Sequence, residues 1–408
     1  MIESGTAQFW RATLALCLGS FMVFSNVYVT QPLLPMLADQ FQISSLQATW
    51  SFTVTTLTLG ISLLIFGPLS DAIGRNTLMI SSLIGVFLCT FFLSQVESFE
   101  WLITLRAVQG VFLAGLPAIA IAFMGDEFNK KAIAVAVGLY ISGNTLGGIG
   151  GRLIGGFIGD WLGWQEAFLV MSLISLVCLS VFTWLLPAPK HFTAQPFSPR
   201  KVITNISMHL KNPLLLLAFL IGGFNFFIFL NQYSYATFLL SSSPYYLPAS
   251  LLGLLFITYL SGTVGSAISG RFNASYPQPL VMAAGIVILM LGSLVTLIPS
   301  VWGIVLGFFI NAFGFFVAHS SVSSWVGKNA LHSRATASSL YLVFYYFGAS
   351  SGGLYLDPFW TTSGWHGVIF ASILVLLMTF TLSITLHKLT LSRLAPPAHD
   401  SYTASILK

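Results

Sequence analysis

The chain has 408 residues, of which 56% are hydrophobic and only 7% are charged. So few charged side chains cannot cover the surface of a soluble globule of this length, so the composition predicts an integral membrane protein. The formal net charge of +5 would suggest nucleic-acid binding only in a soluble chain, so we expect no nucleic-acid partner.

Twelve runs of the sequence are long and apolar enough to be transmembrane helices, which need about 20 such residues. They lie at residues 12–37, 47–69, 77–95, 101–124, 132–158, 165–187, 213–240, 249–270, 279–298, 301–326, 335–356 and 365–387. The predicted fold class is therefore an all-α membrane protein with twelve transmembrane helices. The first run follows Arg11 but is too long for the apolar core of a signal peptide, so we expect it to be retained.

Positive charges gather on one side of this predicted arrangement. With the N-terminus in the cytoplasm, the cytoplasmic segments hold every Lys and Arg outside the helices, and the six outer loops hold none. The positive-inside rule therefore predicts a multi-pass protein of the inner (cytoplasmic) membrane, with both termini in the cytoplasm. The outer side carries carboxylates instead: Asp39, Glu97, Glu100, Asp160, Glu166 and Asp357.

A basic segment that contains prolines, residues 188–212, divides the runs into two sets of six. Within it, Val202, Ile203, Ile206 and Leu210 form an apolar stripe, which predicts an amphipathic helix on the inner membrane surface. We expect an N-terminal six-helix bundle over residues 1–187, a cytoplasmic linker over 188–212, a C-terminal six-helix bundle over 213–390 and a cytoplasmic tail over 391–408. Two roles for the linker stay open: a hinge between the halves and a plain tether.

The two halves repeat parts of each other's sequence. "GPLSDAIGRN" at residues 67–76 returns as "GTVGSAISGRFN" at 262–273, and "GGIGGRL" at 147–153 aligns with "GASSGGL" at 348–354. Each echo falls in corresponding positions of the two halves. Pseudo-symmetric halves of this kind are typical of secondary transporters, whose binding site lies between the halves near the membrane midplane.

The whole chain resembles the major facilitator superfamily, and in particular its drug/metabolite:proton antiporter branch. After the second run, the family pattern G-x-L-(S/A)-D-x-x-G-R-(K/R) is matched by Gly67, Leu69, Ser70, Asp71, Gly74 and Arg75, with Asn76 in the last place. The resemblance implies that Asp71 latches the outward-facing state near the start of the eleventh helix, and that Arg75 meets an acid at the inner end of the fourth. Asp126 stands at that end, so the expected conformational latch is Gly67, Asp71, Gly74, Arg75 and Asp126. The alternative is a plain turn whose charges set topology.

The fourth run contains an arginine in the sequence "RAVQG", residues 106–110. It matches the family's RxxQG motif, which is common in proton-coupled members. Arg106, Gln109 and Pro117 share one helical face. An intramembrane arginine is costly unless it faces a cavity or a partner, so we expect this face to look into the central pathway.

The fifth run is rich in glycine and carries a second arginine. Gly143, Gly147 and Gly151 belong to a surface on which another helix packs closely, as in the glycine motif of the antiporter branches, although the proline usual there is absent. Arg152 is expected at the same depth as Arg106, and no run has an Asp or Glu in its middle. Two accounts stay open: carbonyls, polar side chains and rim carboxylates satisfy both arginines, or the arginines bind an anionic substrate.

Polar side chains in the other apolar runs complete the candidate site, because such side chains usually turn inward. The candidates for substrate binding are Arg106, Gln109, Asn26, Tyr28, Gln31, Asn144, Arg152, Asn225, Gln232, Asn311, Tyr341 and Tyr345. His319 is the candidate carrier of a coupling proton because imidazole titrates near neutral pH, with Asp39 and Asp126 as alternatives at the rims. A neutral, hydrogen-bonded packing histidine is the competing interpretation.

The sequence contains no phosphate-binding loop, metal-ligand spacing or nucleophile motif, so we expect no enzyme activity, no cofactor and no metal. The leading hypothesis is a monomeric secondary active transporter that exports small amphipathic organic compounds or metabolites by alternating access, with protons and the lipid bilayer as its other partners. The alternative is an organic-anion carrier, for a carboxylate metabolite or siderophore, that uses Arg106 and Arg152. A receptor that binds without turnover is a third hypothesis.

Overall fold

The computed structural model describes residues 1–194, 196 and 198–394, and these residues are almost entirely helical. Eleven stretches of the described chain are long and apolar enough to cross a membrane. The longest, Thr336–Ser392, holds two helices that join at Gly364, where φ is 56° and ψ is −140°. The predicted all-α fold with twelve membrane helices is therefore confirmed.

The N-terminal helices begin and end close to the predicted runs. They are α1 (Ala7–Tyr28), η1 (Gln31–Leu33), α2 (Leu34–Phe41), α3 (Ser45–Ile73), α4 (Arg75–Leu93), α5 (Phe99–Leu113), α6 (Gly115–Glu127), α7 (Lys130–Trp161) and α8 (Trp164–Leu185). Gly74 separates α3 from α4 with a φ of 105°, a conformation that L side chains rarely adopt. The second glycine of the loop motif is thus required by the backbone.

The remaining helices form the linker and the C-terminal half. They are α9 (Pro199–Leu210), α10 (Pro213–Ser241), α11 (Ala249–Leu255), η2 (Phe256–Thr258), α12 (Tyr259–Ser275), α13 (Gln278–Val295), α14 (Val301–Asn329) and α15 (Arg334–Leu394). Two of the domain boundaries proposed from the sequence fall between α8 and α9 and between α9 and α10, whereas the proposed start of the tail at residue 391 lies inside α15. Residues 395–408 of the expected tail lie outside the described residues.

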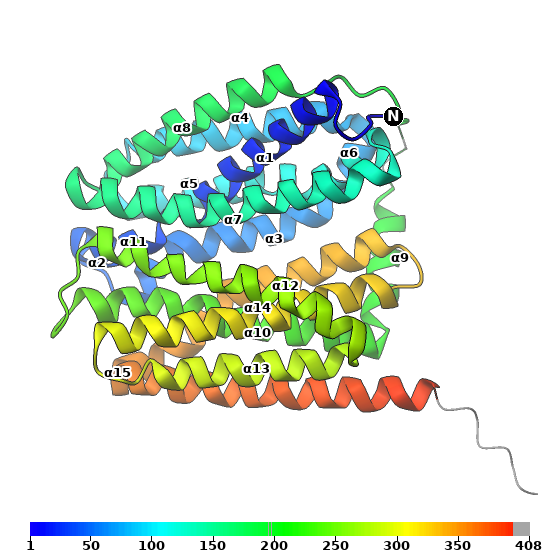
Figure 1. Cartoon of the computed structure of the whole chain (residues 1–408). Coiled ribbons are helices and arrows are strands. Elements are labelled where there is room, and N and C mark those ends of the chain that lie inside the picture. Colours follow the sequence, from blue (N-terminus) through cyan, green and yellow to red (C-terminus); the bar gives the residue numbers. More distant parts are fainter. Residues whose placement is uncertain (195, 197, 395–408) are drawn as a thin grey trace, which may run out of the picture.

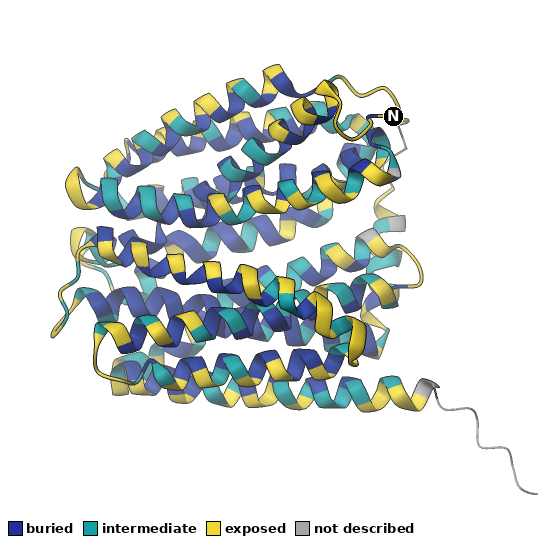
Figure 2. Cartoon of the chain, viewed as in Figure 1, coloured by how far each residue is buried: buried dark blue, intermediate teal, exposed yellow. Residues whose placement is uncertain are grey.

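The helices lie in two bundles, α1–α8 above and α10–α15 below in Figure 1, with α9 at one end. Large apolar side chains remain exposed along the outer faces, as for Leu173, Val177 and Trp184 of α8 (Figure 2). Lipid is the solvent that suits such a surface. We call the end with Arg75 and α9 the basic end, and the end with Asp39 and Asp160 the acidic end.

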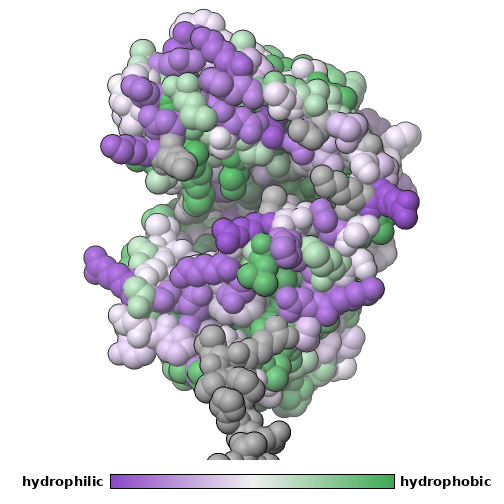
Figure 3. All heavy atoms as spheres, turned by 90° about the vertical axis from the view of Figure 1, so that its right-hand side faces the viewer, coloured by the Kyte–Doolittle hydropathy of each residue, from purple (hydrophilic) through white to green (hydrophobic). Residues whose placement is uncertain are grey.

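The two bundles separate at the basic end and meet at the acidic end. Figure 3 views the basic end and shows a hollow between the bundles. A cleft of about 520 Å³ lies here, lined by Asp71 and Arg75 on one side, Thr336 on the other and Val202 of α9. At the acidic end, a Cβ added to Gly156 of α7 would lie 2.6 Å from the Ala249 carbonyl oxygen of α11, so the two backbones touch.

A short loop at the basic end gathers three parts of the chain. The Ile2 amide donates to the Glu127 carbonyl oxygen at 2.7 Å and the Asn129 amide donates to the Ile2 carbonyl oxygen at 3.0 Å, so Ile2 and Phe128 form a β-bridge. The Glu127 carboxylate accepts the backbone N–H groups of Lys190 and His191, both at 2.8 Å. The N-terminal segment and the start of the linker are therefore both anchored to the N-terminal bundle.

Candidate functional site

A central cavity of about 290 Å³ lies between the two bundles. Aromatic rings from both bundles line it, together with Asn144, Arg152 and His319. Its described lining contains no Asp or Glu. The cavity reaches the cleft of the basic end at Leu63, which lines both. A cargo in this cavity would therefore meet one cationic group, no carboxylate and a largely aromatic wall.

One face of α7 supplies the polar lining from the N-terminal bundle. Tyr140, Asn144, Gly148 and Arg152 all line the cavity, because residues four apart lie nearly above one another on a helix. Another face of α7 packs on α1 through glycine. A Cβ added to Gly143, Gly147 or Gly151 would lie 2.2–2.6 Å from a carbonyl oxygen of α1. These glycines let α1 approach closely and fix which way the face with Arg152 points.

Arg152 lies in an aromatic cage at the cavity wall. Its guanidinium carbon lies 3.9 Å from the ring centroid of Tyr28, 4.3 Å from that of Phe256 and 4.5 Å from that of Tyr259. Each such cation–π contact stabilises a desolvated cation by about 2 kcal/mol. Arg152 is 1% exposed, so the rings replace much of its water.

The guanidinium of Arg152 keeps free donors. Nε donates to the Gln31 Oε1 at 2.8 Å, one terminal nitrogen donates to the Gly148 carbonyl oxygen at 3.0 Å, and the other donates to the Tyr259 hydroxyl at 3.3 Å. A guanidinium has five N–H groups. One N–H on each terminal nitrogen of Arg152 therefore has no acceptor among the described residues.

Arg106, in contrast, has an acceptor for each of its five N–H groups. Nε donates to the Ser51 carbonyl oxygen at 2.7 Å, and the two terminal nitrogens donate to four further acceptors. These acceptors are the carbonyl oxygens of Asn26 and Val27, the Gln109 Oε1 and the Thr30 hydroxyl, at 2.5–3.4 Å. The first two are available because α1 ends at Tyr28, and the last carbonyls of a helix lack partners within it.

The expectation that Arg106 looks into the central pathway is therefore corrected for this conformation. Arg106 is fully buried and does not line the cavity, and all its donors are used by acceptors of α1, α3, Thr30 and Gln109. The expectation that rim carboxylates neutralise the arginines is corrected too, since no salt bridge of the described residues includes Arg106 or Arg152. The two arginines therefore have different environments.

Polar residues around Arg106 form a packing cluster with a counterpart in the other bundle. Asn26 and Gln109 bond to each other and to Thr90, at 2.6–3.4 Å. In the C-terminal bundle, the Asn311 amide donates to the Gln232 Oε1 at 2.8 Å and to the Ser293 hydroxyl at 3.0 Å. These predicted substrate-binding residues join helices within a bundle and do not line the cavity. Asn225 is buried and does not line the cavity either.

His319 of α14 lines the cavity and is held from behind by Tyr341 of α15. The Tyr341 hydroxyl lies 2.7 Å from the His319 Nδ1, and the rings of Phe315 and Tyr345 pack on the imidazole. Of the other predicted residues, Tyr28, Asn144 and Tyr345 line the cavity, whereas Gln31 and Tyr341 stand behind it and hold Arg152 and His319. The structure thus places Arg152, a candidate for substrate binding, and His319, the candidate proton carrier, in the wall of the same cavity.

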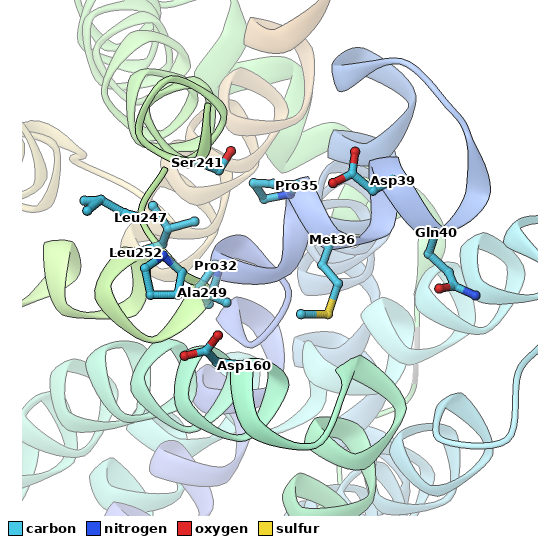
Figure 4. Close-up of a pocket in the computed structure, with 11 residues that line it drawn as sticks. Pro32, Pro35, Met36, Asp39, Gln40, Asp160, Ser241, Leu247, Ala249 and Leu252 are labelled. Carbon is cyan, nitrogen blue, oxygen red and sulfur yellow. The ribbon is translucent and has the colours of Figure 1, made fainter. Parts of the chain in front are cut away.

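The carboxylates Asp39 and Asp160 line a different pocket, of about 440 Å³, at the acidic end (Figure 4). Asp160 accepts a hydrogen bond from the Ser250 hydroxyl at 2.6 Å, which joins α7 to α11. In this conformation neither carboxylate lines the central cavity.

Comparison with known proteins agrees with this architecture. The sequence model of the Major Facilitator Superfamily matches residues 16–353. The chain belongs to the Major Facilitator Superfamily. It is similar to the inner membrane transport protein YnfM of Escherichia coli, with 34% identity over 387 residues that cover 95% of this chain and 93% of that protein. It is also similar to the uncharacterized MFS-type transporter YybF of Bacillus subtilis, with 36% identity over 94% of this chain and 95% of that protein.

A solved structure shares the fold. A bacterial homologue of the human lysosomal transporter Spinster, in an inward-facing and unoccupied conformation, matches with a TM-score of 0.76 and 15% sequence identity, over 97% of this chain and 100% of that chain. The chain is thus a multi-pass membrane transporter of the Major Facilitator Superfamily.

The loop motif of the superfamily lies at the mouth of the cleft. Arg75 forms salt bridges with Asp71, at 3.0 Å, and with Asp126 at the end of α6. Asp71 and Thr336, near the start of the second half's long helix α15, both line the cleft. The expected partner of Asp71 at the start of the eleventh helix is therefore across open space in this conformation, and Asp71 pairs with Arg75 instead.

Several aromatic residues of the site were not among the residues predicted from the sequence. Tyr140 and Phe229 are two that line the cavity, and Phe256 and Tyr259 complete the cage of Arg152. Tyr140 carried a usable signal, because it precedes Asn144 by four residues on the same helix face. Phe256 and Tyr259 carried none, because they reach Arg152 only through the packing of the C-terminal bundle on α7.

Proposed function

We propose that this transporter carries small organic anions with an apolar body. The observation that carries the proposal is the state of Arg152, a cavity arginine with one free N–H on each terminal nitrogen and no carboxylate beside it. Carboxylates and phosphates accept two parallel hydrogen bonds from a guanidinium, and such pairs are among the strong ones. Arg106 takes no part, because its donors are already used.

The surroundings of Arg152 support the same class of cargo. A cation in the membrane interior without a counter-ion is costly, so an incoming anion gains energy there and a cationic cargo is repelled. Rings such as Phe226, Phe229 and Phe316 line the rest of the cavity and suit an apolar or aromatic cargo body. The volume of about 290 Å³ suits a small molecule.

Alternating access of the two bundles is the mechanism we propose. The positive-inside rule assigns the basic end to the cytoplasm, so this conformation is open to the cytoplasm through the cleft and closed on the opposite side. In this proposal the N-terminal segment and the end of α15 are on the cytoplasmic side. Rocking of the bundles about the cavity would expose Arg152 to the other side of the membrane.

Export of small amphipathic compounds coupled to protons is a second proposal, and it is compatible with the first. His319 is the observation that favours it, because this imidazole lines the same cavity and imidazole takes up and releases a proton near neutral pH. In this proposal a proton that enters from outside occupies His319 while the cargo leaves. The cargo of the second proposal need not be charged.

Binding and flux measurements separate the two proposals. Thermal shift of the purified protein with benzoate, benzamide and benzylamine compares an anion, a neutral amide and a cation of similar size. We expect benzoate alone to stabilise the protein, and Arg152→Gln to remove that effect; equal stabilisation by benzamide would sink the anion proposal. Flux of radiolabelled benzoate in inside-out and right-side-out vesicles, with and without a pH gradient, then gives direction and coupling. Export is ruled out if accumulation in inside-out vesicles is absent while uptake into right-side-out vesicles proceeds.

A further inference from the structure

Arg152 belongs to the cavity and also to the contact that closes the acidic end. Its terminal nitrogen donates to the Tyr259 hydroxyl, and the rings of Phe256 and Tyr259 cover its guanidinium. Both residues come from the C-terminal bundle, whereas Arg152 and its third ring, Tyr28, come from the N-terminal bundle. The guanidinium is therefore held from both sides of the interface between the bundles.

A second polar path from Arg152 crosses the same interface. Arg152 Nε donates to the Gln31 Oε1, and the Gln31 Nε2 donates to the Ser234 hydroxyl of α10 at 3.1 Å. Gln31 is fully buried, so its amide has no water to replace these bonds. Through Gln31, the orientation of Arg152 is linked to the position of α10.

The backbones of α7 and α11 also touch beside Arg152. A Cβ added to Gly253 of α11 would lie 2.8 Å from the Arg152 carbonyl oxygen, and Asp160, two turns further along α7, accepts from Ser250. Opening of the acidic end would pull α11 and η2 away from α7. The contacts of Arg152 with Phe256 and Tyr259 can then exist only while this end is closed.

We propose that Arg152 is the latch that keeps the acidic end shut in the empty transporter, and that an anionic cargo releases it. An anion that binds the two free N–H groups neutralises the guanidinium, so the attraction of the Phe256 and Tyr259 rings for it falls. The anion also competes with the weak acceptor Tyr259, whose hydroxyl is 3.3 Å away. The release step rests on the proposed anion-carrier function, whereas the latch itself does not.

The release requires a difference in affinity between the two conformations. A ligand shifts an equilibrium only as far as it binds one state better than the other. With the acidic end closed, the anion shares Arg152 with two rings and a hydroxyl of the C-terminal bundle. With that end open, these competitors are gone, so the anion binds better and the open state gains population.

The test measures the acidic-end distance in the empty protein by pulsed electron paramagnetic resonance. Spin labels are placed at Leu162 and Trp302, which are 62% and 82% exposed at the acidic ends of α7 and α14, after Cys17, Cys89 and Cys178 are replaced by alanine. Phe256→Leu removes a ring that crosses the interface, and Tyr28→Leu is the matched control, because it removes a ring from the arginine's own bundle. Tyr259→Phe removes the hydroxyl and leaves the ring, as a milder second variant.

We expect Phe256→Leu to raise the ratio of open to closed acidic ends about thirtyfold, the size of one desolvated cation–π contact. Tyr259→Phe should raise it less, and Tyr28→Leu should leave it near the wild-type value. Equal ratios for Phe256→Leu and Tyr28→Leu, with Tyr259→Phe at the wild-type value, would overturn the latch.

Benzoate added to the wild-type protein tests the release. A rise in the open fraction that is absent in Arg152→Gln supports the release by an anion. If benzoate binds in the thermal-shift assay but leaves the distance distribution unchanged, the release is wrong and the anion-carrier function stands. If benzoate does not bind while Phe256→Leu opens the acidic end, the latch stands and the anion-carrier function falls.

Discussion

The His319 Nδ1 and the Tyr341 hydroxyl oxygen lie 2.7 Å apart, and they join α14 to α15 beside the cavity. The hydroxyl occupies one ring nitrogen of His319. The pair therefore sets the orientation of the one imidazole that lines the cavity among the described residues.

Substitution of His319 should separate coupling from binding. In His319→Gln we expect the pH gradient to lose its effect on cargo flux, because glutamine cannot carry a proton, while cargo binding to Arg152 persists. Tyr341→Phe should keep the gradient effect but weaken it, since the imidazole loses its only hydrogen-bond partner among the described residues. Flux in vesicles with and without a gradient is the measurement, and full gradient dependence in His319→Gln would place the coupling proton elsewhere.

The two arginines should respond differently to the same change. Arg106→Gln deprives several acceptors of α1 and α3 of their donor, at about 0.6 kcal/mol for each interhelical hydrogen bond in a membrane protein. We expect a clear fall in its melting temperature in detergent. Arg152 keeps free donors even in the wild type. Arg152→Gln should therefore lose benzoate binding and show a smaller fall in melting temperature than Arg106→Gln. The reverse ranking of the two melting temperatures would contradict the assignment of Arg106 to packing.

The glycine face of α7 offers a matched pair of substitutions. A Cβ added to Gly151 would lie 2.2 Å from the Ser25 carbonyl oxygen of α1, whereas a Cβ added to Gly138 meets nothing within 4 Å. Gly151→Ala should therefore push α1 away from α7, lower the melting temperature and slow transport. Gly138→Ala, which has the same gain in helix propensity, should leave both at or above the wild-type values. Similar behaviour of the two variants would show that close approach of α1 is not needed.

The loop at the mouth of the cleft should control turnover more than binding. In this conformation Asp71 pairs with Arg75, so Asp71→Asn removes that salt bridge. The substitution also removes the carboxylate that is proposed to meet the start of α15 in the outward-facing conformation. We expect a fall in the maximal transport rate with little change in benzoate affinity from thermal shift. Equal losses of rate and affinity would count against a conformational role for Asp71.

The fold was predictable because hydropathy alone marks helices that must cross a membrane. The twelve predicted runs each have a helical counterpart, and the join of two helices at Gly364 explains why the longest helical stretch holds two of them. Breaks inside a run were not predicted. The fourth run is divided into α5 and α6 at Ala114, and Pro117 is the signal for this break, because it has no N–H to donate to the Leu113 carbonyl oxygen.

The site was predictable only in part, because depth in the membrane does not identify a partner. Arg106 and Arg152 are both arginines in apolar runs, and they differ in their neighbours. The end of α1 lies beside Arg106, and the start of η2 lies beside Arg152. The first of these had a signal in the sequence. Pro32 has no N–H to donate to the Tyr28 carbonyl oxygen, so a helix end with free carbonyls could be expected near residue 28. The cage residues Phe256 and Tyr259 lie more than 100 residues from Arg152 and depend on how the bundles dock.

The contacts of the loop at residues 127–129 can form only in a fixed order during synthesis of the chain. Ile2 is synthesised before its bridge partner Phe128, and four membrane crossings lie between the two residues in the chain. Lys190 and His191 reach Glu127 later still, after two more crossings. The contacts of this loop can therefore form in two stages during synthesis. The bridge between Ile2 and Phe128 can form first, and the contacts of Glu127 with Lys190 and His191 can form just before the C-terminal half is synthesised.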